Sequence, residues 1–155
     1  MTPWWSDEEW AALNAADGCG MCADAHLDSN PHSILIASTD TTHLRLARNQ
    51  AHAGYGLVIL REHRTDLADL APGQLAAFGR DVQRAGRAIG AALEPRKIDY
   101  LVMGHRMPHL HCHLLPQHAG DDPTRNVDIS DGPVFLDRDA LTARADTIRR
   151  LWNTL

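Results

Sequence analysis

The segment PHLHCHLLP, residues 108–116, alternates histidine with apolar residues between two prolines. Alternate side chains of a β-strand point to the same face, so this pattern predicts a strand with His109, His111 and His113 on one side. Same-face neighbours on a strand lie about 7 Å apart, close enough for three imidazoles to contact one phosphate or one metal ion. Three buried histidines without a shared role would each need separate hydrogen-bonding partners, so we interpret the segment as a functional site.

Further strands are predicted where β-branched and apolar stretches lie between turn residues. These stretches are Ser33–Ala37, Thr42–Ala47, Tyr55–Leu60 and Ile98–Met103. Between the last two, apolar residues recur every three or four positions over 72–93, as on one face of a long amphipathic helix. The order of elements predicts an α+β fold, a mostly antiparallel five-stranded sheet with that helix packed on it.

Both ends of the chain are predicted to carry helices. Ser6 and Glu9 have the spacing of a capping box, and Trp5 before the cap is placed to pack on Trp10. We therefore expect a short N-terminal helix whose indoles pin it to the core. A C-terminal helix over about 138–152 has Asp137 as its predicted cap.

The composition predicts one domain and excludes several kinds of partner. The chain has 155 residues, of which 44% are hydrophobic, enough to bury about two thirds of the unfolded surface. No repeat or linker divides it, so we expect a single domain over 1–155, with a core at about 19–117 and extensions at 1–18 and 118–155. A net charge of −5 without blocks of like charge disfavours nucleic acid and anionic membranes as partners.

The N-terminus lacks a basic segment followed by an apolar run, and no apolar run is long enough to span a bilayer. We therefore predict a cytoplasmic protein. In such a reducing compartment the three cysteines are expected to be thiols or metal ligands rather than a disulfide framework.

The segment 108–116 resembles the motif of the histidine-triad (HIT) hydrolases and nucleotidyltransferases, His-φ-His-φ-His-φ-φ with φ apolar. The upstream stretch GYGLVIL at 54–60, the following REH at 61–63 and the amphipathic helix come in the order found in that family. The resemblance covers about residues 19–117. It implies a HIT-like fold, a small-molecule nucleotide substrate and pairing into homodimers.

The resemblance also implies a mechanism. His111 would attack the α-phosphorus of a nucleoside phosphoramidate, a dinucleoside polyphosphate or a related conjugate, and form a covalent nucleotidyl-histidine. Imidazole suits this step, because it is a nucleophile when neutral and leaves phosphorus readily when protonated. His113 would donate a hydrogen bond or a proton on the leaving-group side, and His109 would position rather than react. This scheme requires no catalytic metal.

Cys19 and Cys22 form a C-x2-C pair flanked by glycines. In the zinc-bearing branch of the HIT superfamily two more ligands occupy the positions of His63 and His109, which implies a closed, four-coordinate structural zinc site. His26 competes for the third position, because a local C-x2-C-x3-H arrangement also has the reach. The cysteine pair is also compatible with unliganded thiols or with a thioredoxin-like redox site.

Four residues are candidates for substrate contacts. Related enzymes bind the ribose through a carboxylate or amide in the loop before the central strand, where this chain has Asn49 and, next to it, Gln50. Many also hold the phosphate with a polar side chain shortly before the motif. Arg106 is the candidate here, although it reads equally well as an exposed loop residue, and neighbouring His105 either approaches the substrate or caps the strand.

Two other classes of function stay open. The atypical loop before the motif is compatible with a non-catalytic nucleotide- or zinc-binding module. In the second class, all three histidines of the motif bind one catalytic metal, as in three-histidine zinc enzymes.

Overall fold

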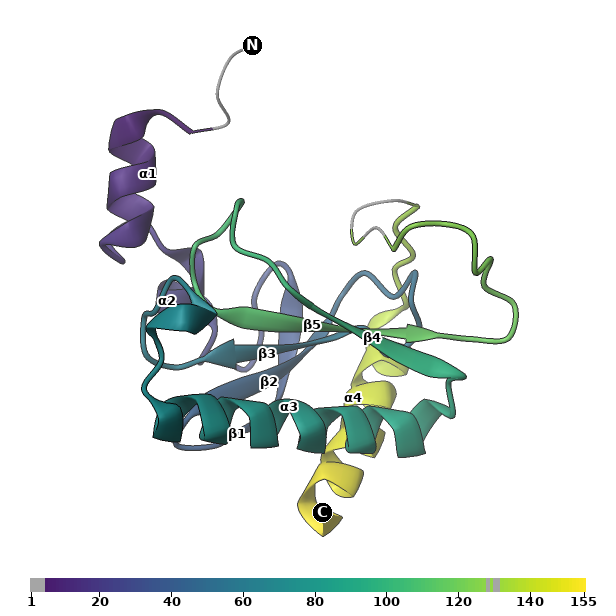
Figure 1. Ribbon diagram of the computed structural model, residues 1–155. Coiled ribbons are helices and arrows are strands. Elements are labelled where there is room, and N and C mark those ends of the chain that lie inside the picture. The colour runs from purple at the N-terminus through teal and green to yellow at the C-terminus, as the bar shows by residue number, and fades with distance from the viewer. Residues whose placement is uncertain (1–4, 128, 130–131) are drawn as a thin grey trace.

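The computed structural model describes residues 5–127, 129 and 132–155 (Figure 1). Five strands form one sheet in the order β1-β2-β3-β5-β4, and every neighbouring pair is antiparallel. The strands are β1 Ser33–Ser38, β2 Thr42–Ala47, β3 Gly56–Leu60, β4 Lys97–Val102 and β5 His111–Gln117. The helices are α1 Asp7–Asn14, α2 Gly20–Asp24, α3 Pro72–Leu93 and α4 Arg138–Thr154, with a 3-10 turn η1 at Leu67–Asp69. This arrangement confirms the predicted α+β fold; residues 1–4 of the predicted N-terminal extension lie outside the described residues.

The path of the chain places β5 inside the sheet. β1, β2 and β3 follow one another and pair as neighbours, whereas α3 carries the chain across to the other edge. β4 forms that edge, and β5 returns between β4 and β3. A strand paired on both sides has its backbone fixed by hydrogen bonds along its length, so the histidines of β5 project from a rigid support.

Two helices cover one face of the sheet (Figure 1). α3 begins with Pro72 at its first position, where the fixed φ of proline suits a helix, and it ends where Glu94 takes a left-handed φ of 47°. Phe78 and Ile89 of α3 are buried in the core, and α4 packs beside α3 over β1. The predicted cap of α4 is confirmed, since Asp137 accepts a hydrogen bond from the Ala140 N–H. None of the described helices is long and apolar enough to cross a membrane.

The alternation along β5 separates the two faces of the sheet. Cys112 and Leu114 are buried in the core under α3, so His111 and His113 point to the opposite face. On that face lies a smaller apolar cluster. It consists of Ala47, Tyr55 and Leu115, with the partly buried Leu57, Leu101, Val127 and Ile129 packed against it.

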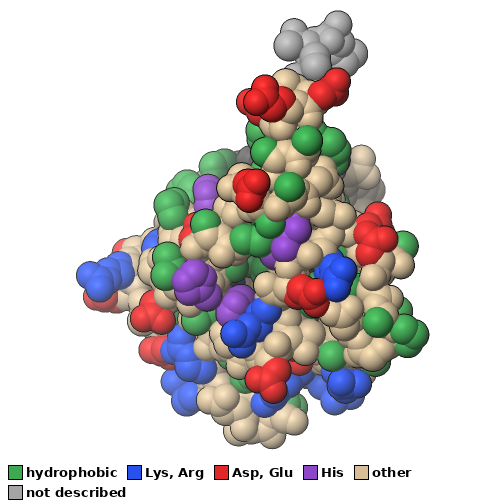
Figure 2. Space-filling view, turned by 90° about the vertical axis from the view of Figure 1, so that its left-hand side faces the viewer, with side chains coloured by type: hydrophobic (Ala, Val, Ile, Leu, Met, Phe, Trp, Pro, Cys, Tyr) green, Lys and Arg blue, Asp and Glu red, His purple; other side chains and the backbone are tan. Residues whose placement is uncertain are grey.

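The N-terminal helix α1 stands away from the sheet (Figures 1 and 2). Its predicted capping box is confirmed, because Ser6 and Glu9 exchange hydrogen bonds of 3.2 and 2.8 Å. The expectation that Trp10 pins this helix to the core is wrong. Trp10 is 38% exposed, and Leu13 is the buried residue of α1.

Candidate active site and metal centre

The orientation of His111 is set by a backbone carbonyl. Its Nδ1 lies 2.6 Å from the carbonyl oxygen of His109. A carbonyl only accepts hydrogen bonds, so Nδ1 donates and the neutral ring keeps a lone pair on Nε2. Burial, opposed in part by this hydrogen bond, lowers the pKa of His111 below its ordinary value. The ring is therefore neutral at neutral pH and offers Nε2 as a nucleophile.

His113 lies between His111 and a buried tyrosine. Its Nε2 is 3.0 Å from Nε2 of His111, and its Nδ1 is 2.8 Å from the hydroxyl of Tyr55. Since Nε2 of His111 is an acceptor, Nε2 of His113 donates, and its Nδ1 in turn accepts from the Tyr55 O–H. The three side chains form one directed chain of hydrogen bonds that ends at the His109 carbonyl.

The pKa of His113 decides which role it plays in the free protein. Burial, with a smaller contribution from His111, lowers that pKa to about 3. At neutral pH the ring of His113 in the free protein is therefore neutral. Of the two roles expected for His113, the free protein therefore favours hydrogen-bond donation through Nε2 over proton donation.

Tyr55 is the residue that the sequence analysis did not assign to the site. It lies just before β3 and is 7% exposed, and burial raises the pKa of its phenol, so it stays protonated and donates. The sequence shows only that Tyr55 and Leu57 share a strand face. That Leu57 pairs with His113, which brings Tyr55 to the site, follows from the sheet register.

A cavity of about 170 Å³ opens in front of the two catalytic candidates. Besides His111 and His113 it is lined by Met103, Gly104, His105, Arg106, Met107, Val127 and Ile129. The loop before β5 thus brings His105 and Arg106 to the cavity, as their positions in the sequence suggested. The C-terminal extension supplies the apolar wall.

Gln50 does not lie at this cavity. Its side chain is 4% exposed, and its Nε2 donates to the carbonyls of Ala47 and Tyr55 at 2.7 and 3.3 Å. Its Oε1 accepts from the N–H of Gly54 at 2.9 Å and from Arg144 at 2.8 Å. Both ends of the Gln50 amide are hydrogen-bonded within the chain, where they hold the turn before β3. The expected contact of Gln50 with a ribose is therefore corrected.

Asn49 makes its hydrogen bonds within the chain. Its Oδ1 accepts from the N–H groups of Ala51 and Val134, both at 3.0 Å, and its Nδ2 donates to the carbonyl of Ile129 at 3.3 Å. These contacts tie the C-terminal extension to the sheet at the segment whose Val127 and Ile129 line the cavity. Asn49 therefore holds the wall of the cavity instead of lining it.

The three histidines do not meet at one point, contrary to the expectation from their spacing. β5 begins at His111, and His109 lies before the strand with its ring turned toward the N-terminal segment. The ring of His109 belongs to a second site, and only its carbonyl serves His111. A catalytic metal bound by all three rings does not fit this arrangement.

The second site gathers four metal-ligating side chains, Cys19, Cys22, His63 and His109, whose ligand atoms all lie within 4.8 Å of one another. Sγ of Cys22 is 3.2 Å from Nδ1 of His63 and 3.4 Å from Nδ1 of His109, and the two Nδ1 atoms are 3.2 Å apart. Ligands of a tetrahedral zinc ion are separated by about 3.3–3.6 Å when they are nitrogen pairs or nitrogen and sulfur. The spacing of the four donors fits a zinc ion.

Both rings of this set are oriented by their other nitrogen. Nε2 of His109 lies 2.6 Å from the carbonyl of Leu60, and Nε2 of His63 lies 3.0 Å from the carbonyl of Asn14. Each Nε2 therefore donates, which leaves the Nδ1 lone pairs aimed at the centre of the cluster. His26, the competing candidate for the third ligand, is exposed and lies outside the set.

The HIT domain family matches residues 29–120, and the chain belongs to that family. Several solved structures have the same fold. A hypothetical histidine triad nucleotide-binding protein from Sulfolobus tokodaii is 19% identical with a TM-score of 0.71, over 88% of this chain and 93% of that one. A histidine triad protein from Bradyrhizobium japonicum is 21% identical with a TM-score of 0.70, over 77% and 90%. A zinc-bound histidine triad family protein from Mycobacterium smegmatis is 22% identical with a TM-score of 0.66, over 88% and 94%.

No curated protein matches this sequence. At these low identities the likeness to the solved structures is one of fold. Membership of the HIT family implies nucleotide hydrolase or transferase activity in the broad sense, and the substrate has to be argued from the site itself.

Proposed function

We propose that the protein cleaves a nucleoside phosphoramidate, a dinucleoside polyphosphate or a related nucleotide conjugate at its α-phosphate, through a covalent nucleotidyl-histidine on His111. The observation that carries the proposal is the hydrogen bond from His111 Nδ1 to the His109 carbonyl. It fixes the tautomer that keeps the lone pair on Nε2, in a ring that lines the cavity.

In the first step the Nε2 lone pair of His111 forms a bond to the α-phosphorus. The bond from phosphorus to the leaving group breaks, and the departing nitrogen or oxygen keeps the electron pair and takes a proton from solvent. Nε2 of His111 no longer accepts the hydrogen bond from His113, so the N–H of His113 turns to a phosphoryl oxygen or to the leaving atom. Arg106 supplies positive charge at the same cavity.

In the second step water attacks the phosphorus, the bond between phosphorus and Nε2 breaks, and the nucleoside monophosphate is released. Another acceptor in place of water would make the same intermediate a transferase intermediate. The chain of hydrogen bonds from Tyr55 through His113 then re-forms on the vacant Nε2.

Nucleotide release from adenosine phosphoramidate, diadenosine tetraphosphate and a nucleotide sugar tests the proposal. We expect the native protein to release nucleotide from at least one of them, and an alkaline quench to trap a nucleotidyl adduct by intact mass. His111→Ala abolishes both signals, whereas His32→Ala, an exposed histidine far from β5, is the matched control. Tight nucleotide binding that survives His111→Ala, without product from any substrate, indicates the non-catalytic module instead.

We propose further that Cys19, Cys22, His63 and His109 hold a structural zinc ion. The donor set and its spacing support this proposal, and four protein ligands leave no open position for substrate. Native mass spectrometry is expected to find one zinc ion per chain, and Cys22→Ser to lose it. The homodimer implied by the family resemblance and the cytoplasmic location are predictions too, and light scattering and cell fractionation test them.

A further inference from the structure

The two cysteines of the proposed zinc site differ in their access to solvent. Cys22 is exposed, whereas Cys19 is 3% exposed. Cys19 stands just before α2 and Cys22 in its first turn, which the N–H of Ala23 closes by donating to the Cys19 carbonyl at 3.2 Å. Such a turn keeps the two Cα atoms within about 7 Å, and a disulfide needs about 4.4–6.8 Å. The two sulfur atoms lie within 4.8 Å of each other, so the pair meets the distance requirement of a disulfide.

The exposure of Cys22 makes the pair a target for oxidants. Metal ligation by cysteine requires the thiolate, which is also the form that attacks a peroxide. A small hydroperoxide reaches this sulfur directly from solvent. Cys112, the third cysteine of the chain, is 2% exposed in the core and lies outside the set of four donors. Oxidation is therefore directed to the pair.

The helix that carries Cys22 contacts the active-site loop. None of the residues of α2 is buried. The terminal methyl of Met107 lies 3.9 Å from the position that a Cβ on Gly20 would occupy. Met107 also lines the cavity that contains His111 and His113. The position of α2 therefore supports one wall of that cavity.

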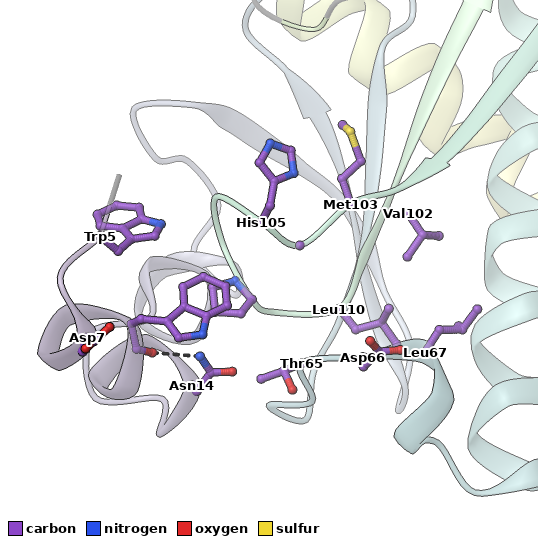
Figure 3. Close-up of a pocket in the computed structure, with 13 residues that line it drawn as sticks. Trp5, Asp7, Asn14, Thr65, Asp66, Leu67, Val102, Met103, His105 and Leu110 are labelled. Atoms are coloured by element: carbon purple, nitrogen blue, oxygen red, sulfur yellow. Dashed lines mark hydrogen bonds between the residues drawn. The ribbon is translucent and has the colours of Figure 1, made fainter. Parts of the chain in front are cut away.

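The set of four donors holds the chain on the N-terminal side of Ala25. At Ala25 itself, the fully buried Arg45 donates to the backbone carbonyl at 2.7 Å and fixes the chain that follows. Before α2, Asn14 and the loop residues 103–105 line one groove (Figure 3). The carbonyl of Asn14 accepts from Nε2 of His63, a member of the set, at 3.0 Å. Loss of the set therefore loosens α1 and α2 against the loop and leaves the sheet in place.

We propose that Cys22 and Cys19 are the site at which a hydroperoxide modifies this protein, and that their disulfide withdraws the support of Met107 at the active-site cavity. The inference rests on the proposed function and on the proposed zinc site, and it names a regulation of both. The disulfide leaves His63 and His109 as the remaining donors of the set, so the ion is released. The His109 carbonyl still accepts from His111, so the effect falls on the cavity wall.

The oxidation proceeds in two steps. The Cys22 thiolate attacks one peroxide oxygen, a sulfur–oxygen bond forms, the oxygen–oxygen bond breaks, and the other oxygen leaves as an alcohol or water after taking a proton. The Cys19 thiolate then attacks the sulfur of this sulfenic acid. The disulfide bond forms, the sulfur–oxygen bond breaks, and the hydroxide takes a proton to become water. The two sulfurs together lose two electrons, and the peroxide gains them.

Hydrogen peroxide and diamide, applied separately to the zinc-loaded protein, test the modification. Diamide removes two hydrogen atoms from a thiol pair and leaves methionine unchanged, so it excludes oxidation of Met107 as the cause. With either oxidant we expect one zinc ion per chain to reach a chromogenic chelator and the chain to lose about 2 Da. Peptide maps should join Cys19 to Cys22 and show Cys112 as a thiol. Dithiothreitol with zinc chloride should reverse these changes.

Two variants serve as controls for the chemistry. Cys22→Ser lacks the attacking sulfur and should form no disulfide within the chain. Cys112→Ala keeps the pair and is the matched control, so its zinc release and mass change should equal those of the native protein.

The link to the active site is tested by KM for adenosine phosphoramidate before and after diamide. We expect KM to rise about tenfold and kcat to change less than about threefold, because the wall loses its support while His111 stays oriented. In Met107→Ala the disulfide should form and zinc should leave, but KM is already raised and should change less than about twofold on oxidation.

The outcomes separate this inference from the proposals beneath it. Zinc retained with Cys19 and Cys22 as thiols in excess hydrogen peroxide overturns the inference. A disulfide and zinc release with an unchanged KM overturns the link to the cavity. A protein that releases nucleotide but is isolated without zinc overturns the ion site, and with it the inference, and leaves the proposed function standing. No nucleotide release by the reduced protein overturns the proposed function, whereas the disulfide and the zinc release still decide on the modification.

Discussion

Tyr55→Phe is the most direct test of the hydrogen-bond chain at the active site. The change deletes one oxygen atom from a side chain that is 7% exposed, and so removes the donor 2.8 Å from His113 Nδ1. Without that donor the His113 proton moves to Nδ1 in part of the molecules, and Nε2 then faces Nε2 of His111 as a second acceptor at 3.0 Å. The donor that the phosphate requires is lost in those molecules.

The size of the effect follows from the general cost of leaving a buried polar group unpaired. An unpaired buried polar group costs about 1–3 kcal/mol. If that cost falls on the transition state, kcat decreases about 5- to 140-fold, since about 1.4 kcal/mol corresponds to tenfold in rate. KM is expected to change little, because Tyr55 lies behind His113 and does not line the cavity.

The assay is steady-state release of adenosine monophosphate from adenosine phosphoramidate, together with two-bond proton-nitrogen correlation spectra of the histidine rings. The spectra report which nitrogen of His113 carries the proton. Tyr100→Phe, the same atomic change at the only other tyrosine of the chain, is 48% exposed and serves as the control. A Tyr55→Phe protein with native kcat and an unchanged His113 tautomer would refute the reasoning.

Three further predictions concern Asn49, the pKa of His113 and the cluster that contains Cys22. Asn49→Ala removes the hydrogen bonds to Ile129 and Val134 that hold the cavity wall. KM for the nucleotide substrate should therefore rise about tenfold, with a smaller change in kcat. An unchanged KM contradicts the role assigned to Asn49. The pKa of His113 is lower in the folded protein, so the unfolded chain binds the proton more tightly. The stability that neutral His113 contributes is therefore present above about pH 6.5 and is lost as the pH falls toward 3. In urea unfolding, the free energy of unfolding should fall over this range with a slope approaching about 1.4 kcal/mol per pH unit, and His113→Asn should reduce that slope. A strong chelator should lower the melting temperature of the native protein but not that of Cys22→Ser, and equal melting curves with and without chelator would argue against a structural metal.

The sequence predicted the fold through patterns that are local. The strands are short apolar runs between turn residues, and α3 is a period of three to four residues that starts at a proline. Such patterns depend on neighbouring residues alone. They also identified His111 and His113 as a pair on one face, because alternation in a strand needs no knowledge of the rest of the chain.

The contacts that the sequence did not predict join distant residues. Alternation put His109 on the same face as His111, but Cys19, ninety positions away, and its neighbours set the direction of its ring. The family resemblance, not the spacing, predicted that His109 lies with the two cysteines. Tyr55 and Asn49 reach their partners through strand register and through the C-terminal segment, and neither is encoded in the local pattern around them.

His109 makes its two contacts through different atoms. Its ring belongs to the cysteine set, whereas the bond that orients His111 comes from its main-chain oxygen. Every amino acid carries that oxygen, so a substitution at 109 changes the proposed ion-binding set and still leaves an acceptor for His111. The proposed ion site can therefore be lost or rebuilt without loss of the contact that orients His111, as long as the backbone keeps its path through 109.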